Sequence, residues 1–163
     1  MPDKPAVASP KAEDRGRILI IDDEADIRES LAYLLEDEGY AFDTAASAAE
    51  GLRRYEAGGY DLLLLDLAMP DRSGMEVLRE IRQRDRETPV LVITAYGSVP
   101  VAVEALKAGA TDFFEKPWKN EKLLLEIDRI LSRRRLENEN VQLKRALKQR
   151  YGFPNIIGKG DRM

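Results

Sequence analysis

Short apolar runs alternate with longer amphipathic segments between residues 17 and 118. The runs occupy five places in the chain: Ile18–Ile21, Ala41–Ala45, Leu62–Leu65, Val90–Ile93 and Phe113–Phe114. Continuous apolar runs of this length are typical of strands that are buried on both faces of a parallel sheet. Because strands and helical segments alternate, we predict an α/β fold with a doubly wound, five-stranded parallel sheet.

Apolar residues recur at helical spacing in the four segments between the runs, and we expect these stripes to pack on the sheet. The stripes are Ile27, Leu31, Leu34 and Leu35; Leu52 and Tyr55; Met75, Leu78 and Ile81; and Val99, Val103 and Leu106. From Lys119 to Arg150 the chain contains neither glycine nor proline and is densely charged. This stretch predicts one long C-terminal helix that leaves the domain.

Composition narrows the chemistry that such a fold could carry. The chain of 163 residues contains no cysteine and no histidine, which excludes zinc sites built on these residues, thiol nucleophiles and Ser-His-Asp triads. A net charge of -4 argues against a chain built throughout for nucleic-acid binding. No apolar run approaches the ~20 residues of a membrane helix. We therefore expect a soluble, cytoplasmic protein with no membrane partner, whose chemistry uses carboxylates, lysine, hydroxyls, the backbone or a bound ion.

Chemically active side chains follow four of the five runs. Asp22 and Asp23 end the first run, Asp66 ends the third, Thr94 ends the fourth and Lys116 follows the fifth. The carboxyl ends of parallel strands share one edge of the sheet, where open α/β sheets bind ligands. Clustered carboxylates repel one another without a cation, and an oxygen-only cluster suits Mg²⁺. The lysine would add a positive charge that suits a phosphoryl oxygen.

Each of these residues also has a purely structural explanation. An aspartate before a helix is a good N-cap, and threonine is common in strands. Their joint occurrence at four strand ends favours a functional pocket over these explanations. Three other aspartates, Asp43, Asp61 and Asp112, are expected at strand beginnings on the opposite edge, as turn residues without a role in the pocket.

The motifs around the expected pocket closely resemble the receiver domain of two-component response regulators. They are Ile-Leu-Ile-Ile-Asp-Asp-Glu (18–24), Leu-Leu-Asp-Leu-Ala-Met-Pro (64–70), Ile-Thr-Ala (93–95) and Glu-Lys-Pro (115–117). The resemblance covers Arg17 to Leu131 and implies a flavodoxin-like receiver fold. It also implies that Asp66 is the phosphoacceptor, which takes a phosphoryl group from a partner sensor histidine kinase.

The resemblance implies roles for the other pocket residues as well. Four groups would bind Mg²⁺: the carboxylates of Asp22, Asp23 and Asp66 and the backbone carbonyl of Ala68. Thr94 and Lys116 would contact the transferred group, and the Lys116–Pro117 peptide bond is often cis in this family. Thr94 and Phe113 would form the switch, with Phe113 in place of the family's switch aromatic residue.

The helix beyond residue 131 carries a second apolar pattern. Leu136, Asn140, Leu143 and Leu147 follow a 4-3-4 spacing, which predicts a short parallel coiled coil over residues 132–150 and hence a homodimer. The alternatives are a solvated helix that does not pair, and a nucleic-acid contact through the basic stretches Arg133–Arg135 and Lys144–Arg150.

The last residues of the chain suggest a larger protein. Phe-Pro-Asn-Ile-Ile-Gly (153–158) resembles the opening of the AAA+ ATPase domain in sigma-54-dependent activators of the nitrogen-regulation type. We therefore expect a disordered tail (1–16), a receiver domain (17–131), a coiled-coil linker (132–150) and the start of a truncated AAA+ domain (151–163). The resemblance implies that sigma-54 RNA polymerase and promoter DNA are partners only through domains that this chain lacks.

Together these features predict a phosphorylation-controlled signalling switch. The chain would catalyse its own phosphorylation but would not be an enzyme. Two other classes of function stay open at this point: an Mg²⁺-dependent phosphatase-like enzyme, and a receiver-like dimerisation module that works without phosphorylation.

Overall fold

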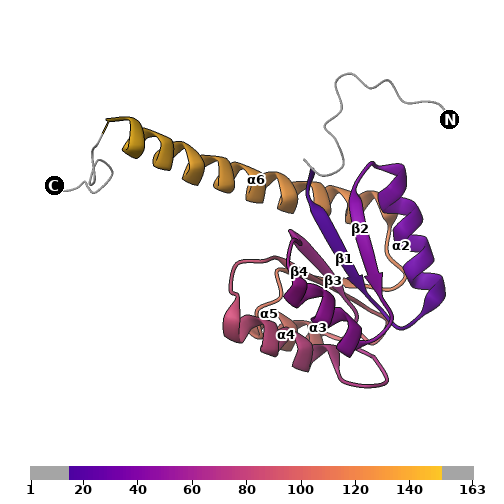
Figure 1. Cartoon of the computed structure of the whole chain (residues 1–163). Helices are drawn as coiled ribbons and strands as arrows, with labels where there is room; N and C mark the ends of the chain where they lie inside the picture. The colour runs from indigo at the N-terminus through magenta and orange to yellow at the C-terminus, as the bar shows by residue number, and fades with distance from the viewer. Residues whose placement is uncertain (1–14, 152–163) are drawn as a thin grey trace.

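The computed structural model describes residues 15–151 and contains one five-stranded sheet (Figure 1). Its strands are β1 (Arg17–Ile21), β2 (Ala41–Ala45), β3 (Leu62–Leu65), β4 (Val90–Thr94) and β5 (Asp112–Glu115). All neighbouring strands are parallel, in the order β2-β1-β3-β4-β5. The predicted doubly wound parallel sheet is therefore confirmed. The strand order reverses beside β1, and this is the place where such sheets bind ligands.

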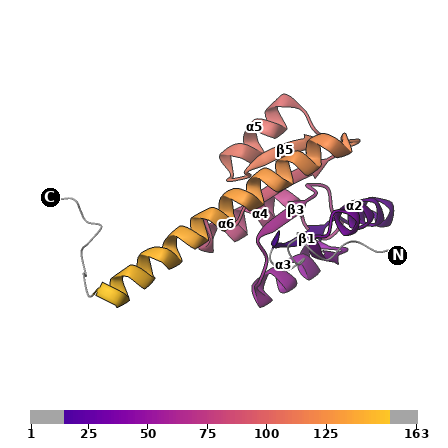
Figure 2. The ribbon, with the colours of Figure 1, turned by 90° about the horizontal axis from the view of Figure 1, so that it is seen from above.

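Helices cover both faces of the sheet. They are α2 (Ala25–Asp37), α3 (Ala48–Ala57), α4 (Gly74–Arg84), α5 (Val99–Lys107) and α6 (Asn120–Tyr151). The helices α2 and α6 pack on one face, and α3, α4 and α5 pack on the other (Figures 1 and 2). In β1, Ile18 and Ile20 point to the first layer while Leu19 and Ile21 point to the second. A strand covered on both sides must be apolar at every position, which explains the continuous runs.

Three of the helices begin at a serine that caps them. The side chains of Ser47, Ser73 and Ser98 each accept a hydrogen bond from the backbone N–H three residues further along. These bonds satisfy N–H groups that would otherwise have no partner in the first helical turn. They fix where α3, α4 and α5 start after the loops that follow β2, β3 and β4.

The apolar stripe predicted for α5 does not face the sheet. Val99, Val103 and Leu106 are 78%, 43% and 47% exposed, whereas Ala105 is completely buried. Nearly every residue of α5 is alanine or a larger apolar residue, so spacing alone could not identify its buried side. The structure turns the small alanine inward and leaves the larger side chains at the surface.

The helix α6 is continuous, as predicted, but its two halves have different surroundings. Leu123, Ile127, Ile130 and Leu131 are buried against the sheet. Beyond them the helix projects away from the domain (Figure 2), and Leu136 and Leu143 are 62% and 60% exposed. Within residues 15–151, no helix is both long enough and apolar enough to cross a bilayer.

Two aspartates that were expected at the amino edge of the sheet, Asp43 and Asp61, are more than turn residues. Asp43 lies in the middle of β2, so the expectation that it begins a strand is wrong. It accepts hydrogen bonds from the Tyr60 hydroxyl at 2.6 Å and from the Arg17 guanidinium at 2.7 Å. Asp61, just before β3, accepts from the Arg17 backbone N–H at 3.0 Å and from Arg134 Nε at 3.4 Å. The sequence positions of Asp43 and Asp61 suggested turns, but hydrogen bonds from residues distant in the chain determine what these two side chains do.

Both predicted terminal segments extend beyond the described residues. Of the predicted tail, the structure describes Arg15 and Gly16, and the Arg15 guanidinium lies 4.2 Å from the ring centroid of Tyr40. Of the predicted AAA+ segment it describes only residue 151, the last residue of α6. The remaining residues of both segments lie outside the described part of the chain.

Candidate functional site at the carboxyl edge of the sheet

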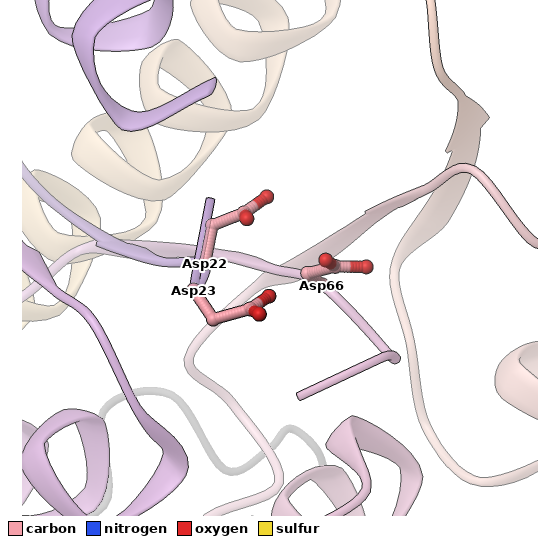
Figure 3. A group of neighbouring side chains, drawn as sticks. All are labelled: Asp22, Asp23 and Asp66. Carbon is pink, nitrogen blue, oxygen red and sulfur yellow. The ribbon is translucent and has the colours of Figure 1, made fainter. Parts of the chain in front are cut away.

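Three carboxylates come together where β1 and β3 end (Figure 3). The backbone N–H of Asp66 bonds to the Ile21 carbonyl at 3.0 Å, and that of Asp22 bonds to the Ala45 carbonyl at 3.1 Å. These bonds continue the sheet ladder by one residue and hold Asp66 beside Asp22 and Asp23. Carboxylate oxygens of the three aspartates lie within 4.8 Å of one another. Asp22 and Asp66 are 2% and 4% exposed, and Asp23 is exposed.

Lys116 supplies the positive charge of the cluster. It follows β5, its side chain is 7% exposed, and the Lys116–Pro117 peptide bond is cis. Its Nζ lies 2.8 Å from Asp22 Oδ2 and 3.2 Å from Asp66 Oδ2. The structure thus joins Lys116 to the acidic residues in a single pocket, as the parallel topology predicted.

The electrostatics of the pocket depend on this lysine. Burial raises the pKa of Asp22 and the charge of Asp66 adds to the effect, while hydrogen bonds from Lys116 and the Glu24 N–H oppose it. Burial alone would lower the pKa of Lys116, but hydrogen bonds to Asp22 and Glu24 and the nearby negative charges raise it instead. Lys116 is therefore charged, and it offsets only part of the negative charge around it.

A divalent cation with a preference for oxygen fits this donor set. The cluster offers carboxylate oxygens from two strand ends, and two of its aspartates are buried. Hard cations such as Mg²⁺ choose such ligands, and a second cation would relieve the repulsion that one lysine leaves.

The loop after β3 folds tightly around Asp66. The Ala68 N–H donates to Asp66 Oδ1 at 3.3 Å, and the Gly74 N–H donates to the Leu67 carbonyl at 2.8 Å. A Cβ on Gly74 would lie 2.1 Å from the Asp66 carbonyl oxygen, so the start of α4 can approach Asp66 only with glycine there. The Ala68 carbonyl as a metal ligand stays a prediction.

Thr94 and Phe113 occupy the neighbouring strands. Thr94 ends β4 and is completely buried, and its hydroxyl oxygen accepts from the Tyr96 N–H at 3.3 Å. Its carbonyl accepts from the Lys116 N–H at 3.0 Å, which ties the two strand ends together. Phe113 is half-buried in β5, and a Cβ on Gly97 would lie 3.0 Å from its ring. The loop after β4 thus packs closely on this aromatic side chain.

Sequence reasoning missed one member of the pocket. Glu24 Oε1 lies 2.9 Å from Lys116 Nζ, as close as the aspartates. The motif Asp-Asp-Glu contained the residue, but nothing local indicated that its side chain would reach a lysine 92 residues away in the chain. Only the packing of α2 beside the loop after β5 brings the two together.

Comparison with known proteins identifies the class to which this fold and site belong. The family model of the response regulator receiver domain matches residues 18–128. The chain therefore belongs to the response regulator receiver family of two-component systems.

Individual relatives agree with this assignment. The chain is 41% identical over 128 residues to the uncharacterized transcriptional regulatory protein YkoG of Bacillus subtilis, covering 78% of this chain and 56% of that protein. It is 36% identical over 148 residues to the C4-dicarboxylate transport transcriptional regulatory protein DctD of Pseudomonas aeruginosa. This match covers 90% of this chain and 32% of DctD. The chain thus spans roughly half or less of these curated relatives.

Solved structures show the same fold. A CheY-like receiver domain protein from Methanospirillum hungatei matches with a TM-score of 0.69 and 36% identity, over 74% of this chain and 97% of that one. NtrX from Brucella abortus matches with a TM-score of 0.71 and 36% identity, over 78% of this chain and 29% of that one.

Proposed function

We propose that the chain is a phosphorylation-controlled switch and that Asp66 is its phosphoacceptor. The observation that supports this most directly is the position of Asp66. Its carboxylate is nearly buried at the end of β3, beside Asp22 and Asp23, with Oδ2 3.2 Å from Lys116 Nζ. A carboxylate held next to a fixed cation is suited to attack a phosphoryl group.

The phosphoryl group would come from a phosphohistidine of a partner sensor kinase, and membership of the receiver family supports this donor. An oxygen of Asp66 forms the new P–O bond while the P–N bond breaks, and the kinase imidazole leaves with the electron pair. Lys116 neutralises charge on the transferred oxygens. Mg²⁺, held by Asp22, Asp23, Asp66 and the Ala68 carbonyl, would supply further charge neutralisation there.

The signal would then pass through Thr94 and Phe113. The Thr94 hydroxyl can donate a hydrogen bond to the new phosphoryl oxygens, which would draw the loop after β4 toward Asp66. Because Gly97 of that loop packs on Phe113, the aromatic side chain would shift with it. This is a local electrostatic change that biases a two-state surface.

The chain would not be an enzyme with turnover, although it would catalyse its own phosphorylation. In a phosphatase-like enzyme the same site would release phosphate from many substrate molecules. In a module that works without phosphorylation Asp66 would carry no phosphoryl group. The three possibilities therefore differ in the number of phosphoryl groups transferred for each chain.

Intact mass measurement after incubation with acetyl phosphate and Mg²⁺ tests the proposal. We expect one adduct of ~80 Da for each chain and none in Asp66→Asn, which lacks the nucleophile. Asp37→Asn is a matched control because Asp37 is an exposed aspartate on α2. An adduct that persists in Asp66→Asn contradicts the assignment, and continuous phosphate release favours the phosphatase-like alternative.

We also propose that the outer half of α6 pairs with its copy in a parallel dimer. At 100° per residue, Leu136, Asn140, Leu143 and Leu147 cluster about 155° around the helix from the stripe that packs on the sheet. A partner helix could therefore approach them without meeting the receiver domain of the same chain. Burying the two exposed leucines, at 62% and 60% exposure, would stabilise the pair by about 1.5–3 kcal/mol each.

Sedimentation at tens of micromolar tests the dimer. Leu143→Glu should give monomers because it places charge in the predicted seam. Val141→Glu is the matched control, since Val141 is 48% exposed on the same helix but outside the seam. A monomeric unmodified chain would exclude the coiled coil and favour the solvated helix.

Finally, we propose that the parent protein is a sigma-54-dependent activator whose ATPase this switch regulates. The support is the Phe-Pro-Asn-Ile-Ile-Gly motif and the similarity to DctD over 148 residues, which extends beyond the receiver domain into α6. Sigma-54 RNA polymerase and promoter DNA would bind the domains downstream. A parent gene that encodes a different output domain after residue 163 would contradict this proposal.

A further inference from the structure

Lys116 has a third partner outside the predicted site. Its Nζ lies 2.8 Å from Asp22, 3.2 Å from Asp66 and 2.9 Å from Glu24. An ammonium group has three N–H donors. Three carboxylates are therefore enough to occupy Lys116 fully before any phosphoryl group arrives.

The side chain of Glu24 is used for this contact and not for its own helix. Glu24 occupies the N-cap position of α2 with an extended backbone, yet its side chain makes no capping hydrogen bond. By contrast, α3, α4 and α5 each begin with a serine that does. The start of α2 lacks this stabilisation, and the Glu24 carboxylate lies on Lys116 instead.

The three contacts differ in how easily they can break. The side chains of Asp22 and Asp66 are 3% and 4% exposed, whereas that of Glu24 is 57% exposed. Breaking a buried ion pair leaves a charge without solvent. An exposed carboxylate that loses its partner is rehydrated at once, so its ion pair costs little to break.

We propose that Glu24 is a positioning residue that holds Lys116 by a releasable contact in the unphosphorylated state. This inference rests on the proposed function of Asp66. A phosphoryl group on Asp66 adds oxygens that need an N–H from Lys116, and the Glu24 contact is the one that is given up. Glu24 therefore opposes phosphorylation weakly and restrains Lys116 until the group is transferred.

The rate of phosphorylation by acetyl phosphate at saturating Mg²⁺ tests this. In that reaction the P–O bond of the donor breaks, acetate leaves with the electron pair, and the Asp66 oxygen forms the new P–O bond. Glu24→Gln should react about threefold faster, the size expected when an exposed ion pair is lost. Glu24→Ser, which restores a good N-cap, should behave in the same way, so a weakened helix cannot explain the result.

Asp26→Asn is the matched control because Asp26 is an exposed acid in the first turn of α2. At high salt, general repulsion of the anionic donor is screened, so Asp26→Asn should match the unmodified chain while both Glu24 variants stay faster. Glu24 variants that are no faster than Asp26→Asn at high salt, or slower, overturn the inference.

A second measurement does not depend on phosphorylation. In the absence of a phosphodonor, an amine-reactive acylating reagent modifies accessible lysines, and peptide mass spectrometry measures the rate at Lys116. This rate should be higher in Glu24→Gln than in Asp26→Asn. An unmodified chain that takes no phosphoryl group refutes the proposed function, while this measurement still tests the contact. Equal acylation rates in the two variants overturn the inference even if Asp66 is phosphorylated.

Discussion

Asp43 within β2 and Asp85 at the end of α4 each have their own hydrogen-bond donors, whereas at the carboxyl edge of the sheet Asp22, Asp66 and Glu24 share one lysine. Asp85, which caps the end of α4, accepts from the Tyr55 hydroxyl, the Thr88 hydroxyl and the N–H groups of Glu87 and Thr88. Asp43 accepts from Tyr60 and Arg17. At the carboxyl edge Asp22 and Asp66 share Lys116, and Asp23 lies beside these two carboxylates.

The difference shows how one residue type stabilises the fold in one place and, under the proposed function, supplies the reactive site in the other. A carboxylate with all its hydrogen bonds satisfied stabilises the fold. Carboxylates that share one cation repel one another and remain able to bind a metal ion or react with a phosphoryl group. Replacing an aspartate by asparagine should therefore change stability in opposite directions at the two places.

The largest effect should come from removing the only lysine of the pocket. Lys116→Met leaves Asp22 and Asp66 buried without their cation and should lower the free energy of unfolding by about 3 kcal/mol in metal-free buffer. Mg²⁺ should restore part of the loss by replacing the missing charge. Near Asp43, Arg17→Met should cost about 1 kcal/mol, because this aspartate keeps the Tyr60 hydroxyl. Urea denaturation measures both, and equal losses would contradict the comparison.

Asp85→Asn should lower the free energy of unfolding by about 2 kcal/mol at neutral pH, since the carboxylate accepts charge-assisted bonds. Burial opposes the charged form of Asp85, but its hydrogen bonds from Thr88 and Tyr55 outweigh that and lower its pKa. A depressed folded pKa gives stability that is fully present above the unfolded value of about 3.9 and is lost as pH falls toward the folded pKa. Denaturation curves of the two proteins should therefore converge below about pH 4. A gap that is constant down to acidic pH would refute this account.

Asp22→Asn should change stability in the opposite direction to Asp85→Asn. It should raise the free energy of unfolding by about 1 kcal/mol in metal-free buffer. Burial and the charge of Asp66 raise the pKa of Asp22, so ionised Asp22 destabilises the fold at neutral pH. As pH falls through the raised folded pKa toward about 3.9, the aspartate is protonated and the advantage of asparagine should vanish. Mg²⁺ titration should show weaker binding. A loss of stability at neutral pH would show that the Lys116 ion pair outweighs the repulsion.

The smallest effect should come from the amino-edge contact of α6. Arg134 reaches both Asp61 and the Glu87 carbonyl, and Arg134→Gln should cost about 0.5 kcal/mol. Amide hydrogen exchange should become faster in α6 from residue 131 onward, because this contact is made where the buried part of the helix ends. Arg133→Gln is the control, since the Arg133 side chain is 82% exposed. Similar exchange in the two variants would show that Arg134 does not hold the helix.

The sequence alone predicted the sheet, the pocket residues and the long helix. Both faces of the sheet are covered, so its strands must be apolar throughout, and this leaves a pattern that can be read without a structure. Parallel topology then places every carboxyl end at one edge, so Asp22, Asp23, Asp66 and Lys116 could be brought together by that rule alone. The resemblance to receiver motifs supplied the roles that we propose for them.

Tertiary structure decided which side of α5 is buried, which partners Asp43 and Asp61 find, and that Glu24 contacts Lys116. In α5 alanine and larger apolar residues occupy several sides of the helix, so its spacing fits more than one orientation. The other contacts join residues far apart in the chain, such as Glu24 and Lys116, which are 92 positions apart. Hydrophobic periodicity records whether a residue is buried, but a polar contact depends on which elements pack side by side, and no local pattern carries that information.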